Sequence, residues 1–443
     1  MTMANNGLFI DQEMKWLSDV ITQRLNLYFK NGQGNEIVEV RSPQETVPDS
    51  PYADFIRRNQ LNTEDRILLA LTFVPHIRPQ LFDCFFIKNS TTGARFAEFG
   101  GIVPGNEGVM IPTLQTFLFI TAGEDLGKKI ELASRFSSHP VFGGKSFIRQ
   151  EVAGTTDYSI APSRELVENL LFGRAYSPGF STDFPAKRIS TTREWTDLVL
   201  DPKTLEQLDL IRKWLEYGDT LMVDWGMRGK LKEGFRALFY GPSGTGKTLS
   251  ATLLGKLTGK EVFCIDLSMV VSKYIGETEK NLSRVFDTAE GKGWILFFDE
   301  ADALFGKRTG LKDSHDRYAN QEIAFLLQRV ENFDGLVVLS TNMKSNLDEA
   351  FARRFQSVIR FKMPDPAQRS LLWRSTFSDK AEFEPGLDLD AISAKYEISG
   401  GSILNVVQYC SLMSLSRNSN LILLDDLVEG IRLEYKKEGK TMI

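Results

Sequence analysis

The sequence predicts an α/β fold for its second half, in which parallel strands alternate with crossover helices. Short, almost continuous apolar runs separated by helical stretches indicate this fold, because strands of a parallel sheet are buried on both faces. The runs occupy residues 237–240, 262–265, 295–298 and 336–339. After Pro364 the pattern indicates helices only, which predicts a small helical domain at the end of the chain.

The first part of the chain is expected to form an α+β domain of its own. Apolar residues share one face of a helix predicted between 14 and 25, and the polar residue Asn62 precedes a second helical run. Residues 181–194 are polar and contain Pro185, so we place a linker there. The expected domains are 1–190, 191–365 and 366–443.

The composition is that of a folded globular protein with no concentrated positive charge. The 443 residues include 53 Lys and Arg against 58 Asp and Glu, and neither half of the chain is basic. Nucleic acid and anionic membranes are therefore disfavoured as partners. The apolar runs are far shorter than the ~20 residues of a membrane span, and no export signal starts the chain. We expect a cytoplasmic protein, in agreement with its three scattered cysteines.

A complete phosphate-binding loop follows the first predicted strand of the second half. The strand ends at Tyr240, and a helix with an apolar stripe begins after the glycines. In such a loop the backbone N–H groups surround phosphates, Lys247 supplies positive charge, and the Thr248 hydroxyl can bind Mg²⁺. The predicted nucleotide contacts are Gly241, Pro242, Ser243, Gly244, Thr245, Gly246, Lys247, Thr248 and Leu249.

Two carboxylates end the strand predicted at 295–298. Asp299 and Glu300 should reach the edge of the sheet where the phosphates lie, because ligands of parallel sheets bind at the carboxyl ends of the strands. We predict that Asp299 belongs to the magnesium shell and that Glu300 orients and polarises the attacking water. The run Asp299-Glu300-Ala301-Asp302 also matches a helicase signature. The acidic charge balance argues against that interpretation.

Three further residues are candidates for catalysis. Asn342 follows the strand predicted at 336–339 and could hydrogen-bond the water or the γ-phosphate. Arg353 and Arg354 could stabilise charge that develops on the phosphate. The spacing of the two arginines is equally compatible with a solvated surface pair.

Together these motifs resemble the AAA+ superfamily, within it the clade of remodelling ATPases that includes katanin and spastin. The resemblance implies an ATPase fold with a parallel sheet and a small helical lid. It also implies that Asp197, Leu198 and Val199 hold the adenine and that Gly401, after Gly400, opens the lid helix. Leu404 stands where some relatives carry a sensing arginine, which the remodelling clade also lacks.

The resemblance further implies a ring, with six subunits expected, and an active site between neighbours. Arg353 and Arg354 become arginine fingers that reach the neighbour's ATP. Lys273, Tyr274, Ile275 and Gly276 resemble the first pore loop, whose aromatic residue grips a polypeptide. A packing role for Tyr274 is open from spacing alone. Residues 317–322, after His315 and Asp316, occupy the position of a second pore loop and the following helix, and we treat them as interface candidates only. The role of 315–317 is open.

The N-terminal segments resemble the winged-helix-like region of AAA+ ATPases that are encoded with bacterial contractile, phage-tail-like injection systems. The matching segments are 68–71, 76–83, 98–101 and 111–119. The resemblance implies an ATP-hydrolysing, Mg²⁺-dependent factor that remodels or assembles a protein partner, with injection-system components as candidate partners. Two alternatives remain open at this point: a factor that uses ATP as a switch without threading, and a DNA-dependent ATPase.

Overall fold

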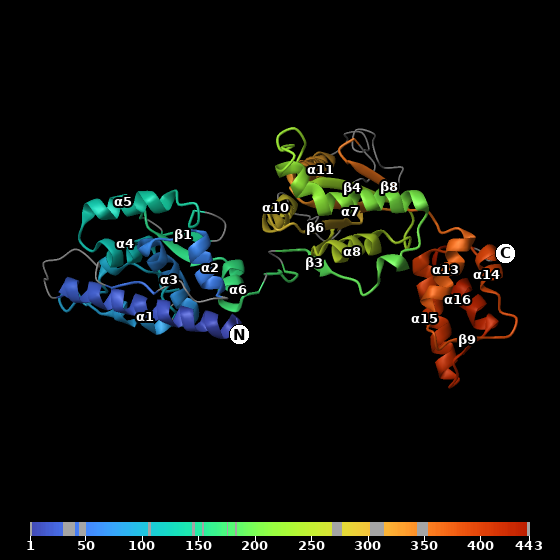
Figure 1. Ribbon diagram of the computed structural model, residues 1–443, viewed down its shortest axis with the longest axis horizontal. Coiled ribbons are helices and arrows are strands. Elements are labelled where there is room, and N and C mark those ends of the chain that lie inside the picture. The colour runs from blue at the N-terminus through green and yellow to red at the C-terminus, as the bar shows by residue number, and fades with distance from the viewer. Residues whose placement is uncertain are drawn as a thin grey trace. The chain divides into compact units, whose positions relative to one another are not determined.

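In the computed structural model the chain divides into two compact units, Met1–Ser177 and Pro178–Ile443 (Figure 1). The structure describes residues 2–29, 40–43, 50–104, 108–143, 147–152, 155–174, 176–181, 184–267, 277–301, 314–342 and 353–440.

The first unit combines helices with one two-stranded antiparallel sheet. The strands are β1 (Phe147–Glu151) and β2 (Tyr158–Pro162), and Arg149 pairs with Ile160. The α-helices are α1 (Thr2–Phe29), α2 (Pro51–Arg58), α3 (Thr63–Ile77), α4 (Leu114–Ala122), α5 (Leu126–Ser137) and α6 (Arg164–Phe172). Two 3₁₀ helices, η1 (Pro79–Phe86) and η2 (Ala97–Phe99), lie between α3 and α4. The first unit contains both helices and strands, as expected for an α+β domain. Its resemblance to a winged-helix fold remains a prediction.

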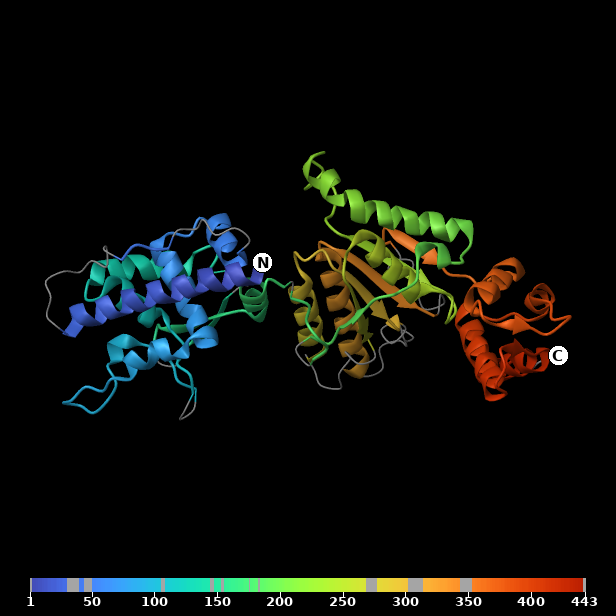
Figure 2. The same cartoon turned by 60° about the horizontal axis from the view of Figure 1, so that its bottom comes forward.

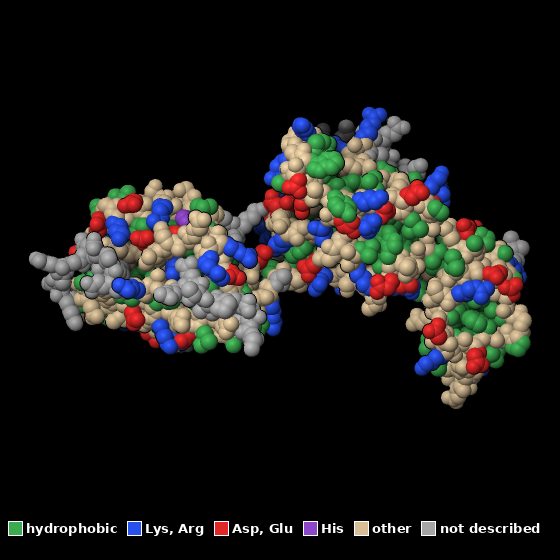
Figure 3. Space-filling model, viewed as in Figure 1, with side chains coloured by type: hydrophobic (Ala, Val, Ile, Leu, Met, Phe, Trp, Pro, Cys, Tyr) green, Lys and Arg blue, Asp and Glu red, His purple; other side chains and the backbone are tan. Residues whose placement is uncertain are grey.

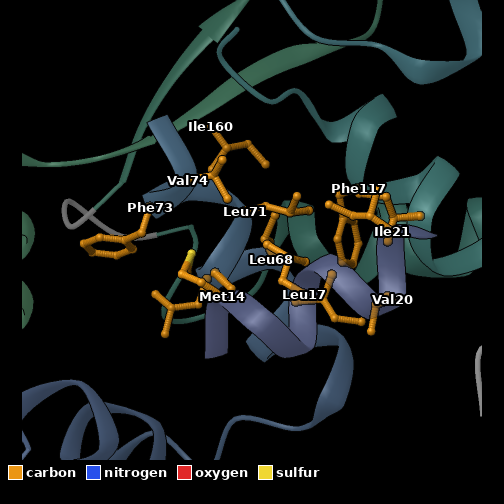
Figure 4. Packing of buried hydrophobic residues seen from close by; sticks show 14 of the residues in the cluster. Met14, Leu17, Val20, Ile21, Leu68, Leu71, Phe73, Val74, Phe117 and Ile160 are labelled. Carbon is orange, nitrogen blue, oxygen red and sulfur yellow. The ribbon is translucent and has the colours of Figure 1, made fainter. Parts of the chain in front are cut away.

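Local sequence explains where these helices begin and which face they bury. Asn62 caps α3 through a reciprocal capping box with Asp65, as the polar residue before the apolar run predicts. The apolar face predicted for α1 is buried and packs against α3 and α4 in one core (Figure 4). That core contains Met14, Leu17, Val20, Ile21, Leu68, Leu71 and Phe117.

The second unit is built on a six-stranded sheet with the order β3-β5-β6-β7-β4-β8. All neighbouring strands are parallel except β3, which pairs antiparallel with β5 at one edge. The strands are β3 (Lys187–Ile189), β4 (Phe235–Tyr240), β5 (Val262–Asp266), β6 (Ile295–Asp299), β7 (Leu336–Thr341) and β8 (Ser357–Arg360). The four predicted strands are confirmed, and the edge strands β3 and β8 were not predicted.

Helices cover both faces of this sheet (Figure 2). Alternate residues of β6 point to opposite faces, so Ile295 and Phe297 join the core under one pair of helices while Leu296 and Phe298 join the other. The first pair is α7 (Pro202–Val223) and α8 (Lys247–Thr258), and the second is α10 (Glu277–Ala289) and α11 (Ser314–Asn332). The α/β prediction is therefore confirmed. A short 3₁₀ helix, η3 (Trp195–Asp197), precedes α7.

The C-terminal part of the second unit, which we call the lid, packs around its own hydrophobic core. Its helices are α13 (Pro366–Thr376), α14 (Leu389–Lys395), α15 (Gly400–Ser416) and α16 (Leu424–Lys437). The prediction of helices only is wrong in one detail, because β9 (Glu382–Phe383) and β10 (Leu421–Ile422) form a parallel pair. Two residues are too few to show strand periodicity in a sequence.

Charged side chains of both signs are interspersed on the face drawn in Figure 3, as the balanced composition leads one to expect. Within the described ranges, no helix has both the length and the apolar character needed to cross a bilayer.

Replacing Leu71 by alanine should destabilise the first unit. Leu71 is fully buried in the core of α1, α3 and α4, and removing such a side chain typically lowers the free energy of unfolding by about 2–5 kcal/mol. Urea denaturation followed by circular dichroism measures the loss. Leu126→Ala is the control, because Leu126 is 68% exposed on α5. Equal effects of the two substitutions would contradict the described core.

Candidate functional site

The phosphate-binding loop lies between β4 and α8 and depends on three glycines with positive φ. Gly241, Gly244 and Gly246 have φ values of 148°, 73° and 100°, conformations that L-residues with a side chain rarely adopt. A Cβ at Gly241 would also lie 1.9 Å from the carbonyl oxygen of Phe361. The loop turns tightly at these residues, and α8 begins directly after it at Lys247.

Lys247 connects this loop to the end of β7. Its side chain is nearly buried, and Nζ donates to the carbonyl oxygens of Gly241 at 2.7 Å and Pro242 at 2.9 Å. The same Nζ donates to Oδ1 of Asn342 at 2.9 Å. The structure thus brings together two predicted site residues that are far apart in the sequence, and it places a positive charge at the start of a helix.

The carboxyl ends of β5 and β6 form an acidic edge beside the loop. Asp266 pairs with Asp299 in the parallel register, so the two carboxylates come from neighbouring strands. Burial raises the pKa of the nearby Cys264 thiol to about 12, and the charges of Asp299 and Asp266 add to this shift. Asp266, the last residue of β5, belongs to no motif and is not predicted from the sequence.

Glu300 leaves the strand in an unusual backbone conformation. Its φ is 52° although it is not glycine, and its N–H donates to Oδ1 of Asp299 at 3.0 Å. Strained backbone of this kind is typical of functional sites. Its exposed side chain lies among the lining residues of the pocket described below, together with Asp299.

The lid touches the phosphate-binding loop through glycines. The backbone N–H of Gly401 donates to the carbonyl oxygen of Gly244 at 2.9 Å. A Cβ at Gly244 would lie 2.5 Å from Oγ of Ser399, and a Cβ at Gly401 would lie 3.0 Å from Cα of Gly244. Ser399 caps α15 by accepting from the N–H of Ser402. The N-terminus of the lid helix therefore meets the loop at van der Waals distance.

The loop, the acidic edge and the lid enclose a pocket of about 430 Å³. Many predicted site residues line it: Asp197, Leu198, Val199, Ser243, Gly244, Thr245, Gly246, Lys247, Thr248, Leu249, Asp299, Glu300, Asn342 and Gly401. Gly241 and Pro242 contribute by holding Lys247. Leu404, at the position where some relatives carry a sensing arginine, also lines the pocket.

Several other lining residues belong to no local motif, so the sequence alone does not predict them. They are Thr191, Arg193, Leu200, Asp201, Lys362, Pro364, Gln368, Leu372 and Thr376. Gly400, named with Gly401 at the start of the lid helix, also lines the pocket. Asp201 caps α7, and its carboxylate lies 3.8 Å from Nζ of Lys362. Of these residues, only Asp201 is indicated by the sequence, because a polar residue directly before a helical run is typical of an N-cap.

The two predicted arginine fingers lie outside this pocket. Both side chains are exposed, and Nη1 of Arg354 is 2.8 Å from Oε1 of Glu331 on α11. The predicted pore-loop residues Lys273, Tyr274, Ile275 and Gly276 lie outside the described residues. Residues 315–322 belong to α11, and the side chains of 315–320 also lie outside the described part of the chain.

A comparison with protein-family models identifies the core of the second unit. Residues 237–363 match the family described as "ATPase family associated with various cellular activities (AAA)". These residues form an AAA module. The match runs from β4 past β8 and includes the phosphate-binding loop, Asp299, Glu300, Asn342 and the two arginines.

Curated relatives resemble the same part of the chain. "Cell division protein C" of Sulfolobus acidocaldarius is 35% identical over 182 residues, covering 39% of this chain and 48% of the relative. "26S proteasome regulatory subunit 6B homolog" of Dictyostelium discoideum is 31% identical over 208 residues, covering 45% and 51%. The chain thus spans about half the length of these relatives.

Among solved structures, "Crystal structure of FIGL-1 AAA domain" aligns with a TM-score of 0.44 and 22% identity. The alignment covers 56% of this chain and 85% of that chain.

Gly244→Ala should weaken nucleotide binding by at least about tenfold, because the added methyl group collides with Ser399 while φ is positive. Gly259→Ala is the matched control: its φ is +66°, and nothing lies within 4 Å of the added Cβ. The control should lose about 1 kcal/mol of stability from backbone strain alone. Titration with a fluorescent ATP analogue measures affinity. Equal affinities of the two variants would contradict the lid contact.

Proposed function

We propose that this protein is a Mg²⁺-dependent ATPase whose AAA module hydrolyses ATP between subunits of a ring and thereby remodels a protein partner. The observation that carries the proposal is the pocket in which the phosphate-binding loop, the acidic edge, Asn342 and the lid meet. Its volume is in the range of small-molecule sites, and Lys247 provides a cation at a helix N-terminus, where phosphates bind.

The chain's own residues take separate parts in the proposed reaction. Water attacks the γ-phosphorus, the bond to the bridging oxygen breaks, and ADP and phosphate leave. Glu300 orients the water and accepts its proton, while Lys247 stabilises the phosphate oxygens. Asn342 is held beside Lys247 by the 2.9 Å hydrogen bond and can direct its amide N–H group to the γ-phosphate or the water.

The residues that would hold Mg²⁺ are Thr248 and Asp299. Both line the same pocket, and hydroxyl and carboxylate oxygens are ligands that suit Mg²⁺ when substrate phosphates complete the shell. The ion would neutralise charge on the β- and γ-phosphate oxygens.

The proposed ring explains the positions of Arg353 and Arg354. An exposed arginine away from its own pocket can serve the pocket of a neighbouring copy, and a head-to-tail interface that closes gives a ring. We propose that this ring has six subunits, as the family resemblance implies. Because Arg354 forms an ion pair with Glu331 of its own chain, we assign the finger to Arg353. Arg354 then orders the chain around Arg353.

The family resemblance supports a more specific biological role for this ATPase. The remodelling clade of katanin and spastin, the pore-loop role of Tyr274 and service to a contractile injection system are all part of the proposal. Relatives named as a cell division protein and a proteasome regulatory subunit support action on a protein partner. The first unit, with its separate core, is the proposed partner-binding region.

The proposal predicts that two inactive variants restore hydrolysis when they share a ring. Glu300→Gln should lower turnover at least about 100-fold through loss of the base, and Arg353→Ala about 1,000-fold through loss of the finger. In co-expressed mixed rings an intact Glu300 can face an intact Arg353. With random placement of equal amounts, about one pocket in four is complete, so about a quarter of wild-type turnover should return.

Phosphate release from purified mixed rings measures this recovery. Glu300→Gln mixed with the double variant is the negative control, because no complete pocket can form. Glu429→Gln, at an exposed ion pair on α16, controls for loss of a carboxylate elsewhere. Each variant must still bind ADP. Absence of recovery in the first mixture would overturn the shared site, and full activity of Glu300→Gln would overturn the catalytic assignment.

A further inference from the structure

The segment that leads into α7 forms one wall of the nucleotide pocket. It follows β3, and both elements are labelled in Figure 1. Thr191 and Arg193 line the pocket together with residues 197–201. Because the first unit ends at Ser177, the chain that joins the two units passes through this wall before it enters the AAA module. We call residues 190–194 the entry segment.

Two interactions fix the entry segment to the AAA module. On one side β3 pairs with β5, where Arg188 lies opposite Phe263. On the other side Lys256, near the end of α8, holds the backbone: its Nζ donates to the carbonyl oxygens of Thr192 at 3.3 Å and Arg193 at 2.8 Å. The same ammonium group lies 2.7 Å from Oε1 of Glu194. Since α8 starts at Lys247, one helix connects the phosphate-binding loop to this segment.

Hydrogen bonds within the segment add to its order. The N–H of Arg193 donates to Oγ1 of Thr191 at 3.1 Å, and the N–H of Glu194 donates to Oδ2 of Asp197 at 2.8 Å. The second bond belongs to a capping box around η3. The backbone that precedes Leu198 and Val199 therefore has a defined path past the pocket.

Arg193 places a positive charge in this wall. Its side chain is half-buried and lines the pocket, and among the described residues its guanidinium has no hydrogen-bonding or ion-pair partner. A planar guanidinium suits both phosphate oxygens and the face of an aromatic base. In a pocket that takes a nucleotide, such a group is available for the ligand.

We propose that Arg193 contacts the bound nucleotide and that Lys256 positions Arg193, so that nucleotide binding further restrains the chain segment by which the first unit is attached. This inference rests on the proposed nucleotide site. The family resemblance assigns the adjacent residues 197–199 to adenine, so the contact falls at the base and ribose end. ATP and ADP share that end, and the contact serves both nucleotides equally.

Calorimetric titration of the full chain with ADP and with a non-hydrolysable ATP analogue tests the contact. Arg193→Ala should raise both dissociation constants about tenfold, the size expected for loss of one charged hydrogen bond. Arg193→Lys, which keeps the charge, should recover part of the affinity. Lys213→Ala is the control, because Lys213 forms an exposed ion pair with Asp209 on α7. It should bind like wild type.

Limited trypsin digestion tests the second half of the proposal, because Lys187, Arg188 and Arg193 are cleavage sites in or beside the entry segment. ADP should slow cleavage there in the wild type. In Lys256→Ala saturated with ADP this protection should be lost, whereas Lys213→Ala should keep it.

Wild-type affinity in Arg193→Ala, or cleavage of the wild type that ADP does not slow, would overturn the inference while the nucleotide site stands. A wild-type protein that binds neither nucleotide would overturn the proposed function itself.

Discussion

The contact between Gly244 and Gly401 is the constraint on which the site depends. One hydrogen bond of 2.9 Å and a backbone approach that leaves no room for a side chain join the phosphate-binding loop to the lid helix. Without that approach the lid residues would not close the pocket. Only glycine permits it, because Gly244 combines a positive φ with a neighbour at 2.5 Å from its missing Cβ.

The parallel sheet supplies the other half of the site. Its alternating side chains bury both faces, and the parallel strands β4 to β8 end at the same edge. Asp266, Asp299 and Asn342 arrive at that edge from β5, β6 and the end of β7, although they are far apart in the sequence. The direction of the strands, more than any single interaction, brings Asp299 and Asn342 into the pocket that Lys247 lines.

The sequence predicts site residues where they form a contiguous motif. It also predicts them where they follow parallel strands, because such strands end at the same edge of a sheet. The phosphate-binding loop is contiguous, and the strands of the central sheet show apolar runs of the expected length, so Lys247, Asp299, Glu300 and Asn342 could be placed together. Residues such as Arg193, Lys362 and Thr376 could not be predicted, because only the folding of distant segments brings them to the pocket. The edge strand β3 has three residues, too few to show alternation.

Hydrogen–deuterium exchange with and without ADP shows whether nucleotide binds between the phosphate-binding loop, the lid and the entry segment. We expect slower exchange at the backbone amides of 243–249, 400–404 and 191–199 together, with exchange in the core helix α3 unchanged. Slower exchange confined to the phosphate-binding loop would contradict the closed pocket, and unchanged exchange in all three segments at saturating ADP would contradict the site.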